Sequence, residues 1–376
     1  MERPPKVLAI VLAGGEGGRL MPLTAERAKP AMPFAGTYRL IDFALSNLTS
    51  AGITDVWIVV QHLPATISDH LAHGRPWDLD RTEGGLRVLP PHSGGEGPDG
   101  MAEGNADALY RNIGLIRDFD PDVLVTMSAD HVVRFDVRAL VEAHRASGAG
   151  VTMGVKELSG EDVSRYAVVQ VEGDRVTGFD YKPEHPKGHT VCTEAFAYDW
   201  PRLREFFDEH GDEDLKDYGD ELLPHFVDRG EARAFPIEEY WRDVGTIESY
   251  WRGHMDLLDP VDGDEGHDPL QLDNPGDPVR TRAINAPPAR IMPGARIENA
   301  LISPRCWIAG EVVRSVLSPG VIVSQGAVVR DAVLLEGVTI APGVRVERAI
   351  VAARYVKADV IGGEEIAVRV QGEPEK

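Results

Sequence analysis

The segment LAGGEGGRLMPLT combines a run of glycines with fixed positive charge, directly after an apolar stretch. Gly14 and Gly15 follow the apolar run Val7–Ala13, and Arg19 and Lys29 come next along the chain. Glycines after a buried strand let backbone N–H groups approach an anion, and the two cations add charge without covalent chemistry. The pattern favours a triphosphate site, although a tight strand-to-helix turn with exposed Arg and Lys would look the same.

The glycine run is not one of the two common nucleotide-binding loops. A dinucleotide fingerprint counted from Gly15 and Gly17 needs a third glycine at position 20, where the chain has Leu20. The sequence also contains no GxxxxGK[ST] loop. If this segment binds phosphates, it belongs to another class of phosphate site.

Two aspartates supply oxygen ligands for a metal. Asp130 follows the apolar run Asp122–Met127, and Asp243 lies in the segment YWRDVGT. Mg²⁺ takes one or two carboxylates together with substrate phosphates, so both aspartates are candidate ligands. A turn or helix-capping role would account for either residue taken alone. Lys182 is a candidate for a second phosphate, although an isolated lysine is more often simply solvated.

The composition excludes several other functions. The chain has 376 residues, of which 39 are basic and 61 acidic, and its net charge of −22 disfavours nucleic acid and anionic membranes as partners. Cys192 and Cys306 form no CxxC motif, so we expect neither a disulfide framework nor a zinc site. The apolar N-terminal run lacks the features of a signal peptide, and no stretch is long enough to span a membrane. We expect a cytoplasmic protein.

The candidate residues must be positioned by a sheet. Short β-branched runs alternate with helical patterns, at Val7–Ala13, Asp55–Val60, Asp122–Met127 and Gly150–Val155. Strands separated by helices predict an α/β fold with a Rossmann-like, mostly parallel sheet. Ligands in such folds bind at the carboxyl ends of the strands, where the glycine run and Asp130 stand. We expect the domain that contains this sheet and the candidate catalytic residues to cover residues 1–256.

The C-terminal part has a different period. After an Asp-, Pro- and Gly-rich linker at 257–285, aliphatic residues recur at a six-residue step, at Val316, Ile322, Val328, Leu334, Ile340 and Val346. This step predicts a left-handed parallel β-helix of hexapeptide repeats over 286–365, with a tail at 366–376. An antiparallel sandwich of short strands is the alternative.

We assign the predicted β-helix to assembly. A hexapeptide acyltransferase would need a catalytic histidine in the coils, and residues 286–376 contain none. Flat coil faces and edges pair with copies of themselves, so we expect a homo-oligomer, a dimer or a tetramer, formed through this domain.

Taken in order, the motifs resemble one enzyme family. The chain contains LAGGEGGRL, PLT, RAKPA, GTYRLIDFALSN, GNADA, ADH, YKP and YWRDVGT. This series is similar to bacterial glucose-1-phosphate adenylyltransferase, also called ADP-glucose pyrophosphorylase, and the hexapeptide region extends the similarity to nearly the whole chain. The resemblance implies a sugar nucleotidyltransferase, in which a sugar 1-phosphate attacks the α-phosphorus of a nucleoside triphosphate and pyrophosphate leaves.

The resemblance also implies roles for individual residues. Nucleotide binding falls to Leu12, Ala13, Gly14, Gly15, Gln61, Gly104 and Asp107. The implied catalytic residues are Arg19, Lys29, Asp130 and Lys182, with Arg19 and Lys29 stabilising the leaving pyrophosphate. Asp130 and Asp243 would bind Mg²⁺, the one expected cofactor. The sugar-phosphate side comprises Tyr181, Lys182, Cys192, Glu194 and Trp241.

The chain departs from the family's motifs on the sugar and base side. The family's EKP is here Tyr181-Lys182-Pro183, and its SMG is Cys192-Thr193-Glu194. Its PAQQ, its WY and the Thr of its GTADA are here Pro90-Pro91-His92-Ser93, Met101-Ala102 and Asn105. Sites that hydrogen-bond a hydroxyl discriminate strongly, so several such changes together favour a changed substrate.

Three hypotheses follow from these observations. The favoured one is an enzyme that joins ATP or GTP to a sugar-like 1-phosphate, such as the C7-cyclitol valienol 1-phosphate of aminocyclitol antibiotic biosynthesis. The alternatives are an ordinary glucose-1-phosphate adenylyltransferase that makes ADP-glucose for glycogen, and a non-catalytic regulatory homologue. The complete set of charged residues argues against the last. Sugar, base, effectors and pathway are left open.

Overall fold

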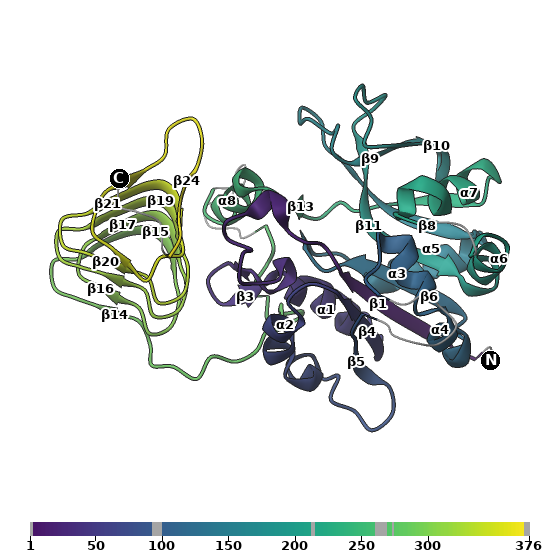
Figure 1. The fold of residues 1–376 in the computed structure, drawn as a ribbon, viewed down its shortest axis with the longest axis horizontal. Helices are drawn as coiled ribbons and strands as arrows, with labels where there is room; N and C mark the ends of the chain where they lie inside the picture. The colour runs from purple at the N-terminus through teal and green to yellow at the C-terminus, as the bar shows by residue number, and fades with distance from the viewer. Residues whose placement is uncertain (1–2, 92–99, 212–214, 260–268, 273, 372–376) are drawn as a thin grey trace. The chain divides into compact units, whose positions relative to one another are not determined.

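The computed structural model describes residues 3–91, 100–211, 215–259, 269–272 and 274–371 (Figure 1). The chain forms two compact units. Unit 1 comprises Met1–Gly15 and Phe43–Trp241, and unit 2 comprises Glu16–Asp42 and Arg242–Lys376. The segment with Arg19 and Lys29 therefore groups with the C-terminal part of the chain, although it directly follows the first strand of unit 1.

Unit 1 is built on a nine-stranded sheet with the order β5-β4-β1-β6-β11-β8-β12-β10-β9. Its strands are β1 (Val7–Ala13), β4 (Asp55–Val60), β5 (Gly85–Leu89), β6 (Val123–Ser128), β8 (Val151–Glu157), β9 (Ala167–Glu172), β10 (Arg175–Tyr181), β11 (Thr190–Asp199) and β12 (Ala232–Pro236). β5, β4, β1 and β6 are parallel, whereas β11 is antiparallel to β6 and β8. The predicted parallel sheet is thus confirmed for the half that carries the glycine run. The other half is mixed, because β9 and β10 form an antiparallel hairpin.

Helices pack on this sheet (Figure 1). They are α2 (Pro64–Leu71), α3 (Asn105–Tyr110), α4 (Ile113–Phe119), α5 (Val137–Ser147), α6 (Trp200–His210) and α7 (Leu223–Asp228), together with most of α1 (Leu40–Ser50). Leu8 and Ile10 of β1 share one buried core with Phe206 of α6 and Phe226 of α7. Because apolar faces of sheet and helices bury one another, this arrangement confirms the predicted α/β class.

Unit 2 begins with a loop of short elements. They are the 3₁₀ turns η1 (Gly18–Leu20) and η2 (Lys29–Ala31) and the paired strands β2 (Pro33–Phe34) and β3 (Tyr38–Arg39). We call residues 16–42 the phosphate loop. β13 (Trp241–Asp243) lies at the boundary of the units, and α8 (Ile247–Met255) follows it. Thr246 caps α8, since its hydroxyl accepts a hydrogen bond from Ser249 N.

The rest of unit 2 contains a β-helix of parallel strands, as predicted, whose successive coils pair in two sheets. One sheet holds β14 (Arg290–Ile291), β16 (Trp307–Ile308), β18 (Ile322–Val323), β20 (Thr339–Ile340) and β22 (Tyr355–Val356). The other holds β15 (Arg296–Ile302), β17 (Glu311–Leu317), β19 (Val328–Leu334), β21 (Arg345–Val351), β23 (Val360–Ile361) and, paired with β21, β24 (Ala367–Arg369). A fully buried aliphatic core lies inside, formed by residues such as Val312, Val329 and Val346.

The coil period differs from the predicted step. Val312 pairs with Val329 and Val329 with Val346, so each coil here takes 17 residues and not three steps of six. As a result Ile322 is 38% exposed, while its neighbour Val323 is fully buried. The six-residue spacing therefore predicted the β-helix but does not mark the inward positions throughout, because one residue of slip turns a strand side chain to the opposite face, as at Ile322.

The β-helix holds α8 and the segment after it. The indole N–H of Trp251 donates to the carbonyl of Asp331 over 2.7 Å, and Arg348 lies over the same ring. Arg314 donates to the carboxylate of Asp259 over 2.9 Å through Nε. These contacts fasten the helix that follows Asp243 to the coils.

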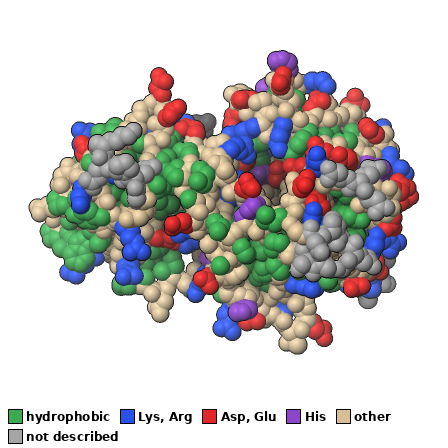
Figure 2. Space-filling view, viewed as in Figure 1, with side chains coloured by type: hydrophobic (Ala, Val, Ile, Leu, Met, Phe, Trp, Pro, Cys, Tyr) green, Lys and Arg blue, Asp and Glu red, His purple; other side chains and the backbone are tan. Residues whose placement is uncertain are grey.

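Some sequence predictions lie outside the described residues: His92, Ser93, linker residues 260–268 and 273, and tail residues 372–376. The proposed boundaries of the domains stay a prediction. Among the described residues, no helix has the length and apolarity needed to cross a membrane. Acidic and basic side chains are interspersed over the face in Figure 2, and its described residues form no continuous basic stripe.

Candidate active site

Gly14 and Gln61 directly follow the carboxyl ends of two neighbouring parallel strands, β1 and β4. β1 ends at Ala13, which pairs with Val60 of β4, so Gly14 and Gln61 leave the sheet side by side. A Cβ at Gly14 would lie 2.7 Å from the amide nitrogen of Gln61. A side chain at position 14 would therefore displace that amide, and this strand end carries both a bare backbone and a hydrogen-bonding side chain.

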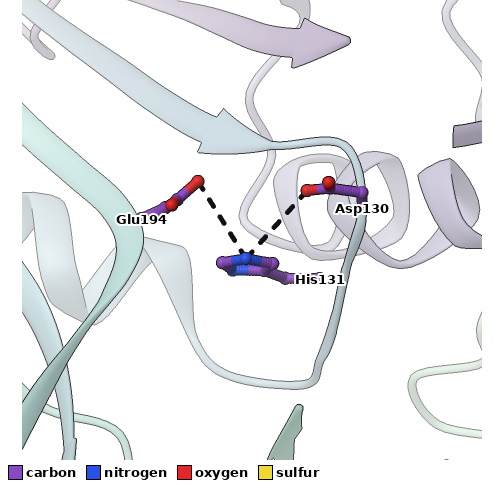
Figure 3. A group of neighbouring side chains, drawn as sticks. All are labelled: Asp130, His131 and Glu194. Carbon is purple, nitrogen blue, oxygen red and sulfur yellow. Dashed lines mark ion pairs between the residues drawn. The ribbon is translucent and has the colours of Figure 1, made fainter. Parts of the chain in front are cut away.

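Asp130 follows β6 and lies in a cluster with His131 and Glu194 (Figure 3). His131 Nε2 is 4.0 Å from a carboxylate oxygen of each acidic residue. The other ring nitrogen, Nδ1, donates to the carbonyl of Thr193 over 2.9 Å. That hydrogen bond fixes the ring and directs Nε2 between the two carboxylates. The Asp130 carboxylate also accepts a hydrogen bond from Ser128 Oγ.

Glu194 occupies an unusual backbone position in β11. Its φ is +57°, a left-handed conformation that costs free energy for any residue other than glycine. The pairing of β11 with β8 shifts register between Cys192 and Phe196, which is where this residue stands. Tyr218 donates its phenolic O–H to Glu194 over 2.8 Å. Burial raises the pKa of Glu194, whereas the nearby His131 lowers it.

Tyr181 is the last residue of β10, and Lys182 directly follows it. The phenol of Tyr181 donates to the carboxylate of Asp217, and Lys182 Nζ lies 3.9 Å from that carboxylate. Burial and the Asp217 carboxylate raise the pKa of Tyr181, so its O–H remains a donor at neutral pH. Lys182 is half exposed and has a φ of +45°. A basic head group thus lies over a tyrosine–aspartate pair.

Asp107 is held by its own helix. Its carboxylate accepts hydrogen bonds from the backbone N–H of Glu103 and from Arg111 Nε, at 2.9 and 2.8 Å. Gly104 precedes α3, and the N–H groups of Ala106 and Asp107 donate to the carbonyl of Lys216. The carboxylate therefore organises the loop before α3, and its predicted contact with the nucleotide stays a prediction.

Cys192 and Trp241 are both buried. Cys192 is 3% exposed within the apolar core, and burial raises the pKa of its thiol to about 12. Trp241 packs edge-on to His131 and Tyr166. Its buried indole N–H has no hydrogen-bond partner among the described residues. Trp241 thus contacts the histidine of the cluster, whereas Cys192 supports β11 from the core.

The phosphate loop of unit 2 brings three predicted residues together. Lys29 is almost fully buried, and its Nζ lies 3.6 Å from a carboxylate oxygen of Asp243. A Cβ at Gly245 would lie 2.8 Å from the Asp243 carboxylate and 3.1 Å from the Arg19 guanidinium. Two cations and one carboxylate therefore meet at this glycine, an arrangement suited to binding phosphate groups and a cation.

The predicted Mg²⁺ ligands fall in different units. Asp130 belongs to unit 1 and Asp243 to unit 2, so the geometry within each unit does not bring them together. Both offer hard carboxylate oxygens, and both side chains keep some exposure, at 20% and 9%. This donor chemistry fits Mg²⁺, which prefers oxygen ligands.

Sequence reasoning missed three partners of these residues. His131 directly follows Asp130, and its position next to a candidate ligand is the signal that could have identified it. Asp217 and Tyr218 hold Tyr181 and Glu194 from a distant segment. The segment KDYGDELL has no spacing typical of a site, so these two could be found only through the rule that buried phenols need partners.

Comparison with known proteins agrees with this fold and these motifs. Residues 8–260 match the nucleotidyl transferase family, and residues 287–367 match the GlmU-like C-terminal hexapeptide. Glucose-1-phosphate adenylyltransferases of Bacillus thuringiensis (strain Al Hakam), Bacillus cereus (strain Q1) and Bacillus mycoides (strain KBAB4) are each 35% identical over 363 residues. The matches cover 96% of this chain and 95% of each relative. The chain therefore belongs to the nucleotidyl transferase family, which confirms the family and the enzyme class that its motifs predicted.

Proposed function

We propose that this chain joins a nucleoside triphosphate to a sugar-like 1-phosphate and releases pyrophosphate. A phosphate oxygen of the 1-phosphate attacks the α-phosphorus while the bond to the β-phosphate breaks, and that electron pair leaves with pyrophosphate. Both reactants are already charged and activated, so the protein has to position them and neutralise charge. The family match and the motif order support this reaction class.

The phosphate loop supplies the cationic side of the proposed site. Lys29 and Arg19 stabilise charge that develops on the leaving pyrophosphate, and Gly14 and Gly15 offer backbone N–H groups to the triphosphate. Lys182 holds the phosphate of the second substrate. Asp130 and Asp243 would hold Mg²⁺, which supplies Lewis acidity and neutralises phosphate charge when bound.

We further propose that the second substrate is a C7-cyclitol 1-phosphate, with valienol 1-phosphate as the favoured example. The supporting observation is Glu194. Its half-buried carboxylate stands in a left-handed backbone position, anchored by Tyr218, where the resembling family has glycine. Tyr181 stands where the family has glutamate, and its phenol donates a hydrogen bond to the carboxylate of Asp217. The acceptors for substrate hydroxyls are therefore rebuilt from other residues, which favours a ring other than glucose.

The base is proposed to be adenine or guanine. Gln61, after β4, is the side chain assigned to read it. Because the motifs around Pro90 and Asn105 differ from the family's, a preference for GTP over ATP is part of the test.

Pyrophosphate release with Mg²⁺ tests the proposal directly. ATP, GTP, UTP, CTP and dTTP are each paired with glucose, mannose, galactose, glucosamine and valienol 1-phosphates. The proposal predicts the largest kcat/KM for valienol 1-phosphate with ATP or GTP. A dominant kcat/KM for ATP with glucose 1-phosphate would overturn the substrate assignment.

The second candidate is an ordinary glucose-1-phosphate adenylyltransferase. The 35% identity to enzymes of that name, over 96% of the chain, favours it. The same grid of reactions separates the two candidates. If no pair of substrates gives pyrophosphate release, the result would instead support a non-catalytic regulatory homologue.

We also propose a cytoplasmic homo-oligomer that assembles through the β-helix. Trp307, Ile322, Thr339 and Tyr355 are successive partners on one face of the short-strand sheet, and three of them are large exposed hydrophobic residues. Such a stripe favours contact with a second copy. Light scattering of the wild type and of Trp307→Ser tests it: a dimer or tetramer should dissociate on substitution. Both cysteines are free and buried, as suits a reducing compartment.

A further inference from the structure

The phosphate loop is tied to the β-helix by one carboxylate. Glu336 lies in the turn between β19 and β20, and its two oxygens bind two arginines of the loop. Arg27 reaches one oxygen at 3.1 Å, and Arg39 binds the other. The three side chains are 19% to 35% exposed, so water screens these pairs only in part. A single acidic residue of the coils thus grips the loop at two points.

The loop is also seated sterically on the same unit. Gly36 has a φ of +83°, and the space for a Cβ there is taken by Ser303 Oγ. The phenol of Tyr250 in α8 donates to the carbonyl of Pro33, and His254 packs against the ring of Phe34. These contacts fix the distal half of the loop, while Lys29 and Arg19 lie in its proximal half.

The charge balance at Glu336 favours the ionised form. Burial alone would raise its pKa, but Arg39 and Arg27 outweigh burial, so the pKa lies below its usual value. Removing the carboxylate would leave two partly buried guanidinium groups without this anion. The two guanidinium groups would then be more stable if they turned towards water or towards another anion, and that movement would loosen the loop.

We propose that Glu336 is a positioning residue for the nucleotidyl transfer reaction, holding the phosphate loop so that Lys29 and Arg19 meet the triphosphate. This inference rests on the proposed function, because that function assigns the two cations to the triphosphate. Glu336 would act through the two arginines that its carboxylate binds, Arg27 and Arg39. The β-helix thereby acts on chemistry through the loop that it anchors.

The test compares Glu336→Gln with Glu311→Gln in the full chain. Glu311 is a matched control, since it also accepts hydrogen bonds from an arginine, Arg330, within the β-helix. Its side chain is 22% exposed, against 30% for Glu336. Steady-state rates are measured with each substrate varied in turn, together with Tm. Binding of inorganic pyrophosphate is measured by calorimetry without turnover.

Glu336→Gln is expected to lower kcat/KM for the nucleoside triphosphate by about tenfold to a hundredfold, because a loop displaced by about 1 Å misplaces both cations. Pyrophosphate binding should weaken in parallel, while KM for the 1-phosphate stays close to wild type. Glu311→Gln should change neither. Glu336→Asp should restore part of the loss.

Equal pyrophosphate binding by the wild type and Glu336→Gln would overturn the inference, whether or not the wild type turns over. A fall that affects both substrates alike and follows Tm would also overturn it, since that is the mark of a general folding defect. If the wild type binds pyrophosphate but shows no turnover with any substrate pair, the proposed function is overturned and the role of Glu336 in pyrophosphate binding is still tested.

Discussion

The cationic cluster of unit 2 and the acidic cluster of unit 1 differ in how closely their residues match the motifs of the resembling family. In unit 2, Arg19, Lys29 and Asp243 stand in motifs that match the resembling family. Lys29 lies 3.6 Å from the Asp243 carboxylate, and the Arg19 guanidinium lies beside Gly245. In unit 1, Glu194 and Tyr181 depart from the family's motifs and are held by Tyr218 and Asp217. Phosphate groups are common to all substrates of the family, whereas ring hydroxyls differ.

The difference teaches where substrate change is tolerated. A phosphate needs fixed positive charge whatever it is attached to, so loss of one cation costs transition-state stabilisation for every substrate. A hydroxyl needs one acceptor in one direction, and that acceptor can come from a different residue. The following predictions test this division between the two regions.

Lys29→Met is expected to have the largest effect on activity, a fall in kcat of about 10²–10³-fold for every substrate pair. It also removes one of the two cations near the buried Asp243 carboxylate, so the free energy of unfolding should fall by about 1–3 kcal/mol. Steady-state kinetics and urea unfolding measure the two effects.

The double variant Lys29→Met/Asp243→Asn separates these effects. It should recover most of the lost stability, because both charges are gone, and none of the activity. Recovery of activity would show that Lys29 does not bind a phosphate group. It would contradict the proposed contrast between the phosphate-binding region and the hydroxyl-binding region.

Acidification should destabilise unit 2 through His254. Burial lowers its pKa from 6.5 to about 4, so the unfolded state binds the proton first. Stability is therefore full above about pH 6.5 and is lost as pH falls towards about 4, by on the order of 3 kcal/mol. Urea unfolding at pH 7.5 and 4.5 measures the loss.

Two other groups sharpen this pH prediction. His144 of unit 1 has its pKa lowered to about 4 for the same reason, so His254→Gln should keep roughly half of the pH slope. Glu194 acts with the opposite sign, since its pKa is raised and its protonation on acidification favours the folded state. An unchanged slope in His254→Gln would show that the ring is not buried neutral.

The double substitution Tyr181→Glu/Glu194→Gly should move the preference towards glucose 1-phosphate. It restores the two residues of the family's motifs, and we expect the ratio of kcat/KM for glucose over valienol 1-phosphate to rise about 10–100-fold. The control is pyrophosphate binding, which should not change. An unchanged ratio of kcat/KM would show that other residues determine which 1-phosphate the enzyme prefers.

The smallest effects test the coil register of the β-helix. Val323→Ala removes a fully buried side chain and should cost about 2 kcal/mol of unfolding free energy. Ile322→Ala, one residue earlier and 38% exposed, should cost about 0.5 kcal/mol or less. Equal costs in chemical denaturation would support a six-residue step instead.

Local patterns predicted much of the molecule. The alternation of apolar runs and helical segments was enough for β1, β4 and β6 of the parallel half of the sheet but did not reveal β5. The recurrence of aliphatic residues was enough for the β-helix. It was not enough for its register, because a 17-residue coil drifts from a step of six until Ile322 faces outward. Periodicity reports which residues are apolar, but packing decides which of two neighbours turns inward.

The candidate site was predictable where chemistry is local and not where it comes from tertiary contact. The glycine run, Asp130 and Asp243 carry recognisable spacing. Glu194 and its donor Tyr218 are 24 residues apart, and Arg39 and Glu336 are 297 apart. No periodicity links such pairs, since only the fold brings them into contact.

The grouping of the phosphate loop with the C-terminal unit has a consequence for biosynthesis. The loop leaves the ribosome early, but its partners Tyr250 and Glu336 lie 217 and 297 residues beyond the loop residues that they bind. At about 5–20 residues per second, Glu336 is made some 15–60 s after Arg39. A nascent chain therefore carries this loop without its partners for most of its synthesis, and a chain stopped before the coils has Arg27 and Arg39 without the carboxylate of Glu336 that binds them.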